Sequence, residues 1–146
     1  MKPVLIDHFE EQYRLGIDEM DDTHREFVDL VNRLEKADKA EFIRLFEELV
    51  VHTRHHFEAE NRQMKESGFP AINEHMGEHQ RVLGEMHRFG VRVEQGNILL
   101  ARAYVVEQLP AWFSLHAQTM DSALAAHIKA RQHALQTDSS LPSIPL

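Results

Sequence analysis

The sequence predicts an all-α protein, an up-down-up-down antiparallel four-helix bundle with a non-helical N-terminal arm. Two observations lead to this fold class. Apolar residues recur at alternating spacings of three and four in four separate segments, which is typical of helices that bury one face in a bundle. Glycine-rich or proline-containing segments interrupt that pattern at 67–70 and 96–97. Each of these segments is expected to end a helix and turn the chain.

The first two helices are expected over residues 18–37 and 39–67. The inward stripe of the first consists of Met20, His24, Phe27, Val31 and Leu34. The second has the same rhythm in Phe42, Phe46, Leu49, Thr53, His56, Glu60 and either Gln63 or Met64. Gly68 at its end and Pro70 just after it are strong stop signals.

The last two helices are expected over residues 71–94 and 98–131. The third carries the stripe Ile72, His75, His79, Val82, Met86, Phe89 and Val93. The fourth aligns Val105, Leu109, Trp112, His116, Met120, Ala123 and His127. Pro110 lies within this fourth pattern, where it predicts a kink or a restart of the helix because proline lacks the backbone N–H.

The chain is expected to divide into an N-terminal arm at 1–17, the bundle at 18–131 and a flexible C-terminal tail at 132–146. Its length of 146 residues suits one domain with a sizeable core. The last ten residues are rich in Ser and Pro, which is typical of a poorly ordered end.

Composition narrows the classes of function. The net charge is -8, and no run of Lys or Arg forms a phosphate-binding stripe, so nucleic acid is not expected as a partner. There are no cysteines, which excludes disulfides and cysteine-based zinc or iron–sulfur sites. No apolar run is long enough for a signal segment or a membrane span, so we expect no membrane association and a cytoplasmic location.

Seven ionisable residues interrupt the apolar stripes, and they come from all four helices. They are His24, His56, Glu60, His75, His79, His116 and Asp121. The pairs His56/Glu60 and His75/His79 are spaced i, i+4, so the two side chains of each pair lie only about 40° apart on a helix. Burying so many imidazoles and carboxylates without partners would cost several kcal/mol each. A bound pair of metal ions removes that conflict.

The pair on the fourth helix has a less regular spacing. His116 and Asp121 are five residues apart, which places them roughly 140° apart on a regular helix. A one-residue π-bulge within 117–120 would bring the two side chains together, and such bulges are frequent at functional sites. Alternatively, Asp121 reaches sideways to a metal near the bundle axis.

The remaining histidines do not have this spacing. We expect His55 to be solvated, whereas His52 lies one turn before His56 and is either a neighbour of the ligands or a residue at the solvent edge. The others, which we expect to be structural or exposed, are His8, His87, His127 and His133.

Taken together, these residues resemble the hemerythrins, and specifically the single-domain bacteriohemerythrins. The resemblance covers residues 13–128 and rests on four motifs in the family's order. The first is the segment 16–24, Gly-Ile-Asp-Glu-Met-Asp-Asp-Thr-His. The second is HFxxE at 56–60, followed by Met64 and the Gly68-Phe69-Pro70 turn. The third is HxxxH at 75–79, and the fourth is WxxxHxxxxD at 112–121.

The resemblance implies a non-haem di-iron centre with a bridging oxo or hydroxo group. One iron would be held by His75, His79 and His116, and the other by His24 and His56. Glu60 and Asp121 would bridge the two irons. Two departures from the family pattern concern packing and ligand access: Ala117 follows the histidine of the fourth helix where an aliphatic residue is usual, and Pro110 lies in a region that is usually plain helix.

Counting these ligands gives six for the three-histidine iron and five for the other. Dioxygen or another small diatomic ligand is therefore expected beside His24 and His56. A neutral, histidine-rich ligand set disfavours high-valent oxidising intermediates, so we rank reversible dioxygen binding, for carriage, storage or sensing, above an enzyme. The alternatives are a di-iron enzyme acting on nitric oxide, peroxide or iron, and an iron-homeostasis protein. The sequence does not identify a redox partner.

Overall fold

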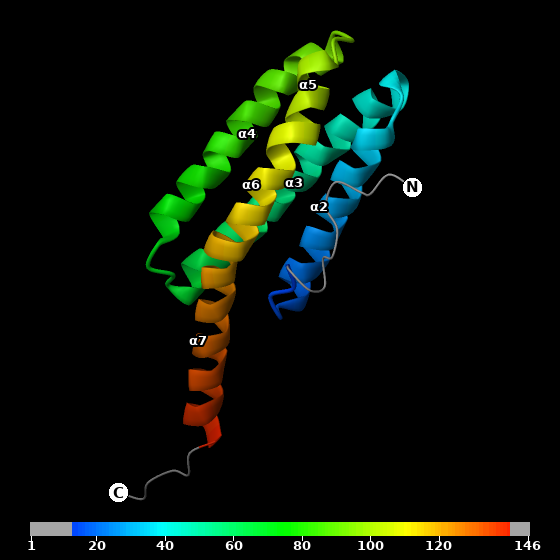
Figure 1. Cartoon of the computed structure of the whole chain (residues 1–146). Coiled ribbons are helices and arrows are strands. Elements are labelled where there is room, and N and C mark those ends of the chain that lie inside the picture. The colour runs from blue at the N-terminus through cyan, green and yellow to red at the C-terminus, as the bar shows by residue number, and fades with distance from the viewer. Residues whose placement is uncertain (1–12, 141–146) are drawn as a thin grey trace, which may run out of the picture.

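The computed structural model describes residues 13–140, with helices in four columns. The first column is α2 (Asp18–Lys36), the second is α3 (Lys39–Ser67) and the third is α4 (Ile72–Glu94). The fourth is continuous and consists of α5 (Leu99–Ala103), the π-helical η1 (Tyr104–Gln108), α6 (Leu109–His116), the π-helical η2 (Ala117–Asp121) and α7 (Ser122–Ser140). Successive columns run antiparallel (Figure 1), which confirms the predicted all-α four-helix bundle.

Local sequence signals set the ends of α3. The Asp38 carboxylate accepts a hydrogen bond from the backbone N–H of Glu41 at 2.9 Å and so caps the first turn. At the other end Gly68 adopts φ 66°, a left-handed conformation that favours glycine. The Phe69 N–H then bonds back to the Met64 carbonyl at 3.0 Å. The expected bounds of 39–67 are therefore correct, and the inward residue at the end of this helix is the buried Met64.

The fourth column stays helical past Pro110, and the π segment before the proline explains why the helix is not broken there. Proline cannot donate a backbone hydrogen bond and its ring crowds the carbonyl four residues earlier. The wider turn η1 directly precedes α6, whose second residue is Pro110, so the irregularity is absorbed before the proline. The segment η2 follows His116 and ends at Asp121, so the π-bulge is the one of the two alternatives for this pair that the structure has.

The π segments also shift the buried face of the fourth column. After His116 the buried residues are Ala117, Asp121, Leu124 and Ala125. Ala123, which the regular pattern placed inside, is exposed, and Met120 is only half-buried. The predicted stripe is therefore wrong for Ala123, because each extra residue in a π turn rotates the following side chains.

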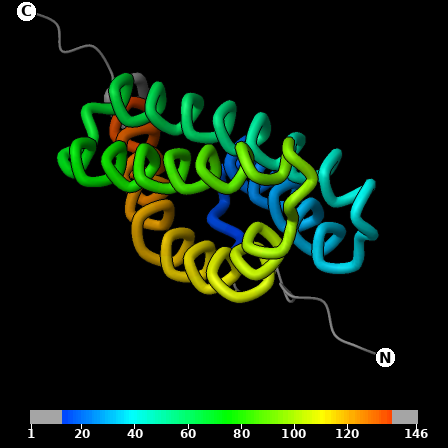
Figure 2. Tube along the Cα trace, turned by 90° about the horizontal axis from the view of Figure 1, so that it is seen from above, coloured from blue at the N-terminus to red at the C-terminus, as the bar shows by residue number. Residues whose placement is uncertain are grey.

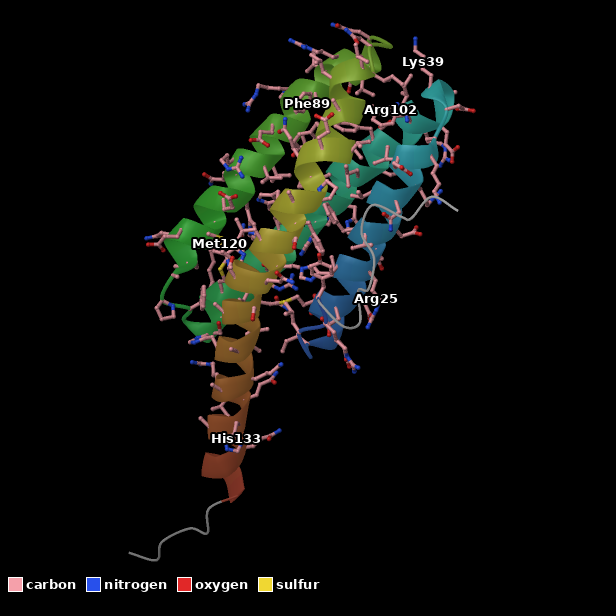
Figure 3. The ribbon with its side chains drawn as sticks, viewed as in Figure 1. Arg25, Lys39, Phe89, Arg102, Met120 and His133 are labelled. Carbon is pink, nitrogen blue, oxygen red and sulfur yellow. The ribbon has the colours of Figure 1, made fainter. Side chains whose placement is uncertain are left out.

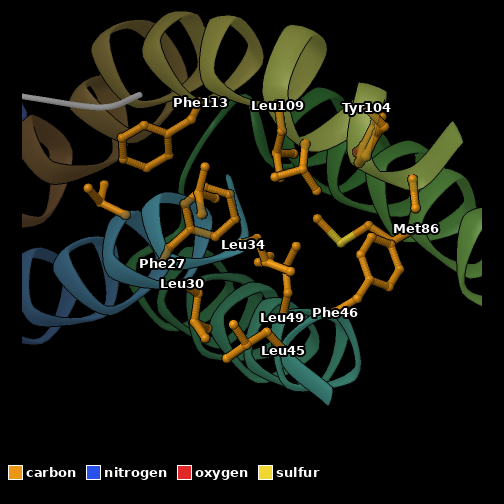
Figure 4. Packing of buried hydrophobic residues seen from close by; sticks show 14 of the residues in the cluster. Phe27, Leu30, Leu34, Leu45, Phe46, Leu49, Met86, Tyr104, Leu109 and Phe113 are labelled. Atoms are coloured by element: carbon orange, nitrogen blue, oxygen red, sulfur yellow. The ribbon is translucent and has the colours of Figure 1, made fainter. Parts of the chain in front are cut away.

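The apolar core fills the end of the bundle near the α2–α3 and α4–α5 turns. Its largest buried side chains come from all four columns, among them Phe27, Leu34, Phe46, Leu49, Met86, Leu109 and Phe113 (Figure 4). A smaller cluster lies at the opposite end around Met20, Met64, Phe69 and Leu124. Figure 2 shows α3 and α4 side by side along this core.

Non-helical residues precede α2, and the last helix continues beyond its expected end. Residues 13–17 precede α2 and are not helical, and the buried Asp21 carboxylate accepts the backbone N–H groups of Leu15 and Gly16 at 2.7 and 2.9 Å. At the other end α7 continues to Ser140, beyond the expected end of the bundle at 131. Figure 3 places His133 on the part of α7 that extends past the other helices.

The expected arm residues 1–12, including His8, and the last residues 141–146 lie outside the described part of the chain. Within 13–140, no helix is both long enough and apolar enough to cross a lipid bilayer.

Candidate metal centre

All seven residues singled out from the sequence are buried. The most accessible, His56, is 6% exposed, and His24 is 0% exposed. All four helical columns contribute: α2 carries one of the seven residues, and α3, α4 and the α6–η2 segment carry two each. The i, i+4 pairs on α3 and α4 point into the bundle as their spacing predicts.

The seven side chains converge on two adjacent points. In the first group, one nitrogen or oxygen from each residue lies within 4.8 Å of every other: Glu60, His75, His79, His116 and Asp121. The second group meets the same limit: His24, His56, Glu60 and Asp121. Only the two carboxylates belong to both groups, so they lie between three imidazoles on one side and two on the other.

Each carboxylate directs its two oxygens to different groups. Oε1 of Glu60 lies 3.1 Å from Nε2 of His79 and 3.3 Å from Nε2 of His75. Its Oε2 instead lies 2.5 Å from Nε2 of His56 and 3.5 Å from Nε2 of His24. This is the arrangement of a carboxylate that can bridge two cations.

Asp121 repeats the same arrangement from the fourth column. Its Oδ1 lies 3.0 Å from Nε2 of His116 and 3.1 Å from Nε2 of His75, whereas its Oδ2 lies 3.0 Å from Nε2 of His24. The π turn η2 makes this possible, because it ends at Asp121 and brings that side chain to the same face as His116.

Most of these converging atoms make no hydrogen bond. They include Nε2 of His24, His75, His79 and His116, Oε1 of Glu60 and both oxygens of Asp121. Buried polar atoms in proteins normally have partners, and leaving them without any is costly. Apart from the hydrogen-bonded pair of His56 Nε2 and Glu60 Oε2, these nitrogen and oxygen atoms point at common centres without hydrogen bonding one another, which fits two bound cations.

The charges in the cluster explain its pKa values. Burial lowers the pKa of His24, but its contacts with Asp121 and Glu60 outweigh burial and raise the pKa to about 10. The same balance raises the pKa of His75 to about 9. For His79 burial dominates, and its pKa is lowered.

The two carboxylates show the reciprocal effect. Burial raises the pKa of Glu60, but the surrounding imidazoles, with His56 first, lower it well below the ordinary value. Burial and the nearby Glu60 raise the pKa of Asp121, but its close contacts with the imidazoles of His116, His24 and His75 outweigh both effects, so the pKa lies below the ordinary value. Both carboxylates are therefore held in the anionic form that binds cations.

Aromatic rings enclose the cluster. Phe57 stacks on His79 with ring centroids 3.9 Å apart and planes 6° from parallel. Trp112 stacks on His116 at 4.7 Å, and Phe113 meets His24 edge-on at 5.5 Å. These apolar contacts fix the imidazole planes and exclude water from the cluster.

Two supporting polar residues were not found from the sequence. Asn61 Oδ1 lies 2.9 Å from Nδ1 of His79, and Glu78 accepts a hydrogen bond from the indole N–H of Trp112 at 2.8 Å. Each directly adjoins a predicted ligand, Glu60 or His79. Their adjacency to these ligands was the only signal in the sequence, and it did not reveal which side chains they would contact.

The other histidines in the described chain lie outside the cluster. His55, His87 and His133 are exposed, as expected. The Nε2 atom of His127 lies 2.8 Å from the backbone carbonyl oxygen of Ser67. This contact links α7 to the end of α3, so His127 has a structural role. His52 lies at the edge of the site, with its Nε2 2.9 Å from Oε2 of Glu26.

Comparisons with known proteins agree with the motifs and the fold. Residues 15–129 match the Hemerythrin HHE cation binding domain. The chain is 32% identical over 121 residues to a bacteriohemerythrin from Ralstonia nicotianae, covering 83% of this chain and 88% of that protein. A bacteriohemerythrin from Stenotrophomonas maltophilia is 25% identical over 126 residues, covering 84% and 81% of the two chains.

Solved structures show the same architecture. A wild-type hemerythrin has a TM-score of 0.78 with this chain at 18% identity, covering 85% of this chain and 98% of the other. A variant hemerythrin gives a TM-score of 0.79 at the same identity. The domain match covers most of the sequence, and the chain therefore belongs to the hemerythrin family.

Proposed function

We propose that the seven clustered residues bind two iron ions with a bridging oxo or hydroxo group, and that the protein binds dioxygen reversibly. One observation carries this proposal: Glu60 and Asp121 each direct one oxygen to a three-histidine group and the other to a two-histidine group. Imidazole and carboxylate donors suit iron. When bound, such a di-iron pair would supply the electrons that reversible dioxygen binding requires.

The ligand set indicates where the small molecule binds. The group around His24 and His56 has four protein residues, whereas the group around His75, His79 and His116 has five. The His24 and His56 side, which has fewer protein donors, would therefore leave more room for a small ligand. A small diatomic ligand is the partner that this buried position suits.

The protein residues around that position keep water and protons away. Phe27 and Phe113 stack with centroids 5.1 Å apart, and Trp112 meets both Phe27 and Phe57 edge-on. Exclusion of water prevents hydrolytic and proton-coupled side reactions at a reactive centre. This apolar wall, with the neutral imidazole set, favours release of the ligand over its chemical conversion, so we rank the binding protein above an enzyme.

An optical experiment tests the proposal. The iron-loaded, reduced protein is mixed with air, and the visible spectrum is recorded through several cycles of oxygenation and deoxygenation. We expect an oxygen-dependent band that disappears on deoxygenation and returns. The matched pair His56→Ala and His55→Ala changes neighbouring histidines, of which only His56 faces the cluster. We expect the band to be lost in the first variant and kept in the second.

Other outcomes would contradict the carrier proposal. Immediate irreversible oxidation on first exposure, or catalytic turnover of nitric oxide or peroxide, would favour the enzyme alternative. Iron that is taken up and released without any oxygen-dependent band would favour an iron-homeostasis role. A cytoplasmic location and the absence of a nucleic-acid partner remain predictions from composition, and the redox partner is not identified.

A further inference from the structure

Helix geometry places a layer of four inward residues next to the metal cluster, one on each column. Neighbouring columns are antiparallel, so the same level of the bundle is reached by counting forward on α2 and α4 and backward on α3 and α6. A residue three positions after a cluster histidine on α2 or α4 therefore lies level with a residue three positions before one on α3 or α6. Counting in this way from His24, His56, His79 and His116 gives the residues Phe27, Thr53, Val82 and Phe113. Figure 4 shows two of them, Phe27 and Phe113, close together at the edge of the apolar core.

Thr53 is the only polar member of this layer. Its side chain is 0% exposed, and its neighbours in the layer belong to the main apolar core. Thr53 and Glu60 are seven residues apart, which places them within about 20° on the same face of α3. The hydroxyl-bearing side chain therefore faces the bundle interior, one turn before the ligand His56.

The Thr53 hydroxyl has no hydrogen-bond partner. Thr23 and Thr119, which also lie in described helices, behave differently. Thr23 donates to the Glu19 carbonyl at 2.8 Å, and Thr119 donates to the Leu115 carbonyl at 2.6 Å, in each case four residues earlier. This bond to the preceding turn is the ordinary way for a helical threonine to satisfy its hydroxyl. Thr53 does not make it.

An unsatisfied buried hydroxyl destabilises a fold, and valine would fill the same volume without that cost. A partner supplied by a bound molecule would offset the cost. The layer that contains Thr53 adjoins the His24 and His56 side of the cluster, since Phe113 of this layer contacts His24 directly. A small ligand held on that side would extend into this layer.

We propose that the Thr53 hydroxyl donates a hydrogen bond to the small ligand bound beside His24 and His56. The inference rests on the proposed function, because it requires a ligand at that position. The ligand class is a diatomic or triatomic molecule with a hydrogen-bond acceptor at its outer end. Thr53 would thus contribute to the retention of such ligands over apolar gases of similar size.

Azide is a suitable probe, because it binds ferric iron and its far nitrogen accepts hydrogen bonds. Azide is titrated into the oxidised, iron-loaded protein, and the infrared stretch of the bound azide is recorded. Loss of one hydrogen bond in Thr53→Val should weaken azide binding about fivefold and shift the stretch. Thr53→Ser, which keeps the hydroxyl, should restore both values towards those of the original protein. Thr23→Val removes a hydroxyl that is already bonded within α2 and should change neither.

A second measurement needs no iron. If the hydroxyl is unsatisfied in the protein without ligand, Thr53→Val should raise the melting temperature of the iron-free protein by about 3 °C. An unchanged or lower melting temperature would mean that the hydroxyl already has a partner, and would overturn the inference. Unchanged azide affinity and stretch in Thr53→Val would also overturn it. Measurements on the original protein separate this outcome from failure of the proposed function. If the proposed function is wrong, the original protein itself lacks two irons or shows no reversible oxygen-dependent band.

Discussion

Trp112 stacks on His116 and at the same time donates its indole N–H to the carboxylate of Glu78 at 2.8 Å. Glu78 lies on α4 and is held by Arg81, which lies 2.6 and 3.1 Å from its two oxygens. This guanidinium lowers the pKa of Glu78 to about 2. The ion pair of Glu78 and Arg81 thus positions the indole ring that stacks on His116, and it links α4 to the fourth column.

Replacing Glu78 should therefore destabilise the protein. We expect Glu78→Ala to lower the free energy of unfolding by about 1 kcal/mol, at the low end for a charged hydrogen bond because the side chain is partly exposed. Urea titration measures the change. Glu66→Ala removes a carboxylate from a more exposed ion pair with Arg62 at 3.9 Å, and it should change stability by less than about 0.5 kcal/mol. Equal losses in the two variants would contradict the role given to Glu78.

Metal content should follow the division into two groups. Glu60→Ala or Asp121→Ala should disturb both metal positions, because each carboxylate contacts histidines of both groups. His79→Ala should weaken mainly one position, since its Nε2 contacts only Oε1 of Glu60. Plasma emission spectroscopy of the purified variants gives the iron per chain. The original protein should contain two irons, and a single tightly bound metal would rule out the dinuclear assignment.

Iron should also contribute to the stability of the bundle. The cluster joins all four columns, and without metal it leaves many buried donors and acceptors unpaired. Removal of iron by a chelator should therefore lower the melting temperature clearly, and adding ferrous iron back should restore it. His87→Ala, at an exposed histidine away from the cluster, provides a control that should show the same difference between the two forms. An unchanged melting curve would mean that the site does not hold the columns together.

The pH dependence of stability should differ between the iron-free and iron-loaded forms. In the iron-free protein the pKa of His24 is raised from 6.5 to about 10 and that of His75 to about 9. A raised pKa in the folded state gives stability that is fully present below about pH 6.5 and is lost as the pH rises towards 9 or 10. The lowered pKa values of Glu60 and Asp121 give stability that is lost as the pH falls below about 4.

Thermal melting across this range tests the expectation. Iron-free protein should be most stable between about pH 4.5 and 6.5 and should lose stability towards pH 9. The lowered pKa of His79 acts in the opposite sense, whereas the raised pKa values of both His24 and His75 favour the loss of stability at high pH. In the iron-loaded protein the coordinating imidazoles must be neutral, so the loss above pH 6.5 should be absent. A rising melting temperature between pH 6.5 and 9 in the iron-free form would contradict the charge assignment.

Some features of this site could be predicted from sequence because they depend on local periodicity. The i, i+4 pairs and the glycine at the end of α3 act over one or two turns, and the structure has them where they were expected. The five-residue spacing of His116 and Asp121 left two alternatives, and the π turn decides between them. The exposed position of Ala123 could not be predicted, because the shift of register depends on tertiary packing that selects the π turn.

Contacts between columns were beyond the reach of periodicity. Thr53 follows the inward pattern of α3, but only the structure shows that its hydroxyl lacks a partner. Asn61 is half-buried and follows a ligand in sequence, and its contact with His79 depends on how α3 and α4 pack. Such pairs are set by the relative rotation of two helices, which the sequence of either helix alone does not specify.

The final prediction concerns Ala117, a small residue that follows His116 and is fully buried within the main core. A small side chain here leaves the apolar wall less tightly filled than a larger aliphatic one would, so water and protons reach the site more readily. We expect Ala117→Val to slow the spontaneous oxidation of the oxygenated protein several-fold, because the added methyl groups tighten the wall. Overpacking could cost about 1–3 kcal/mol of stability, so melting is measured in parallel.

Stopped-flow mixing of the reduced proteins with air separates binding from oxidation. The formation of the oxygen-dependent band gives the binding rate, and its later decay under constant oxygen gives the oxidation rate. Ala123→Val adds the same methyl groups at an exposed position on the same column and should change neither rate. If Ala117→Val oxidises as fast as the original protein while binding two irons and melting normally, the wall at this position does not limit access of water and protons. Faster oxidation in Ala117→Val would instead show that the added volume opens the wall by displacing its neighbours.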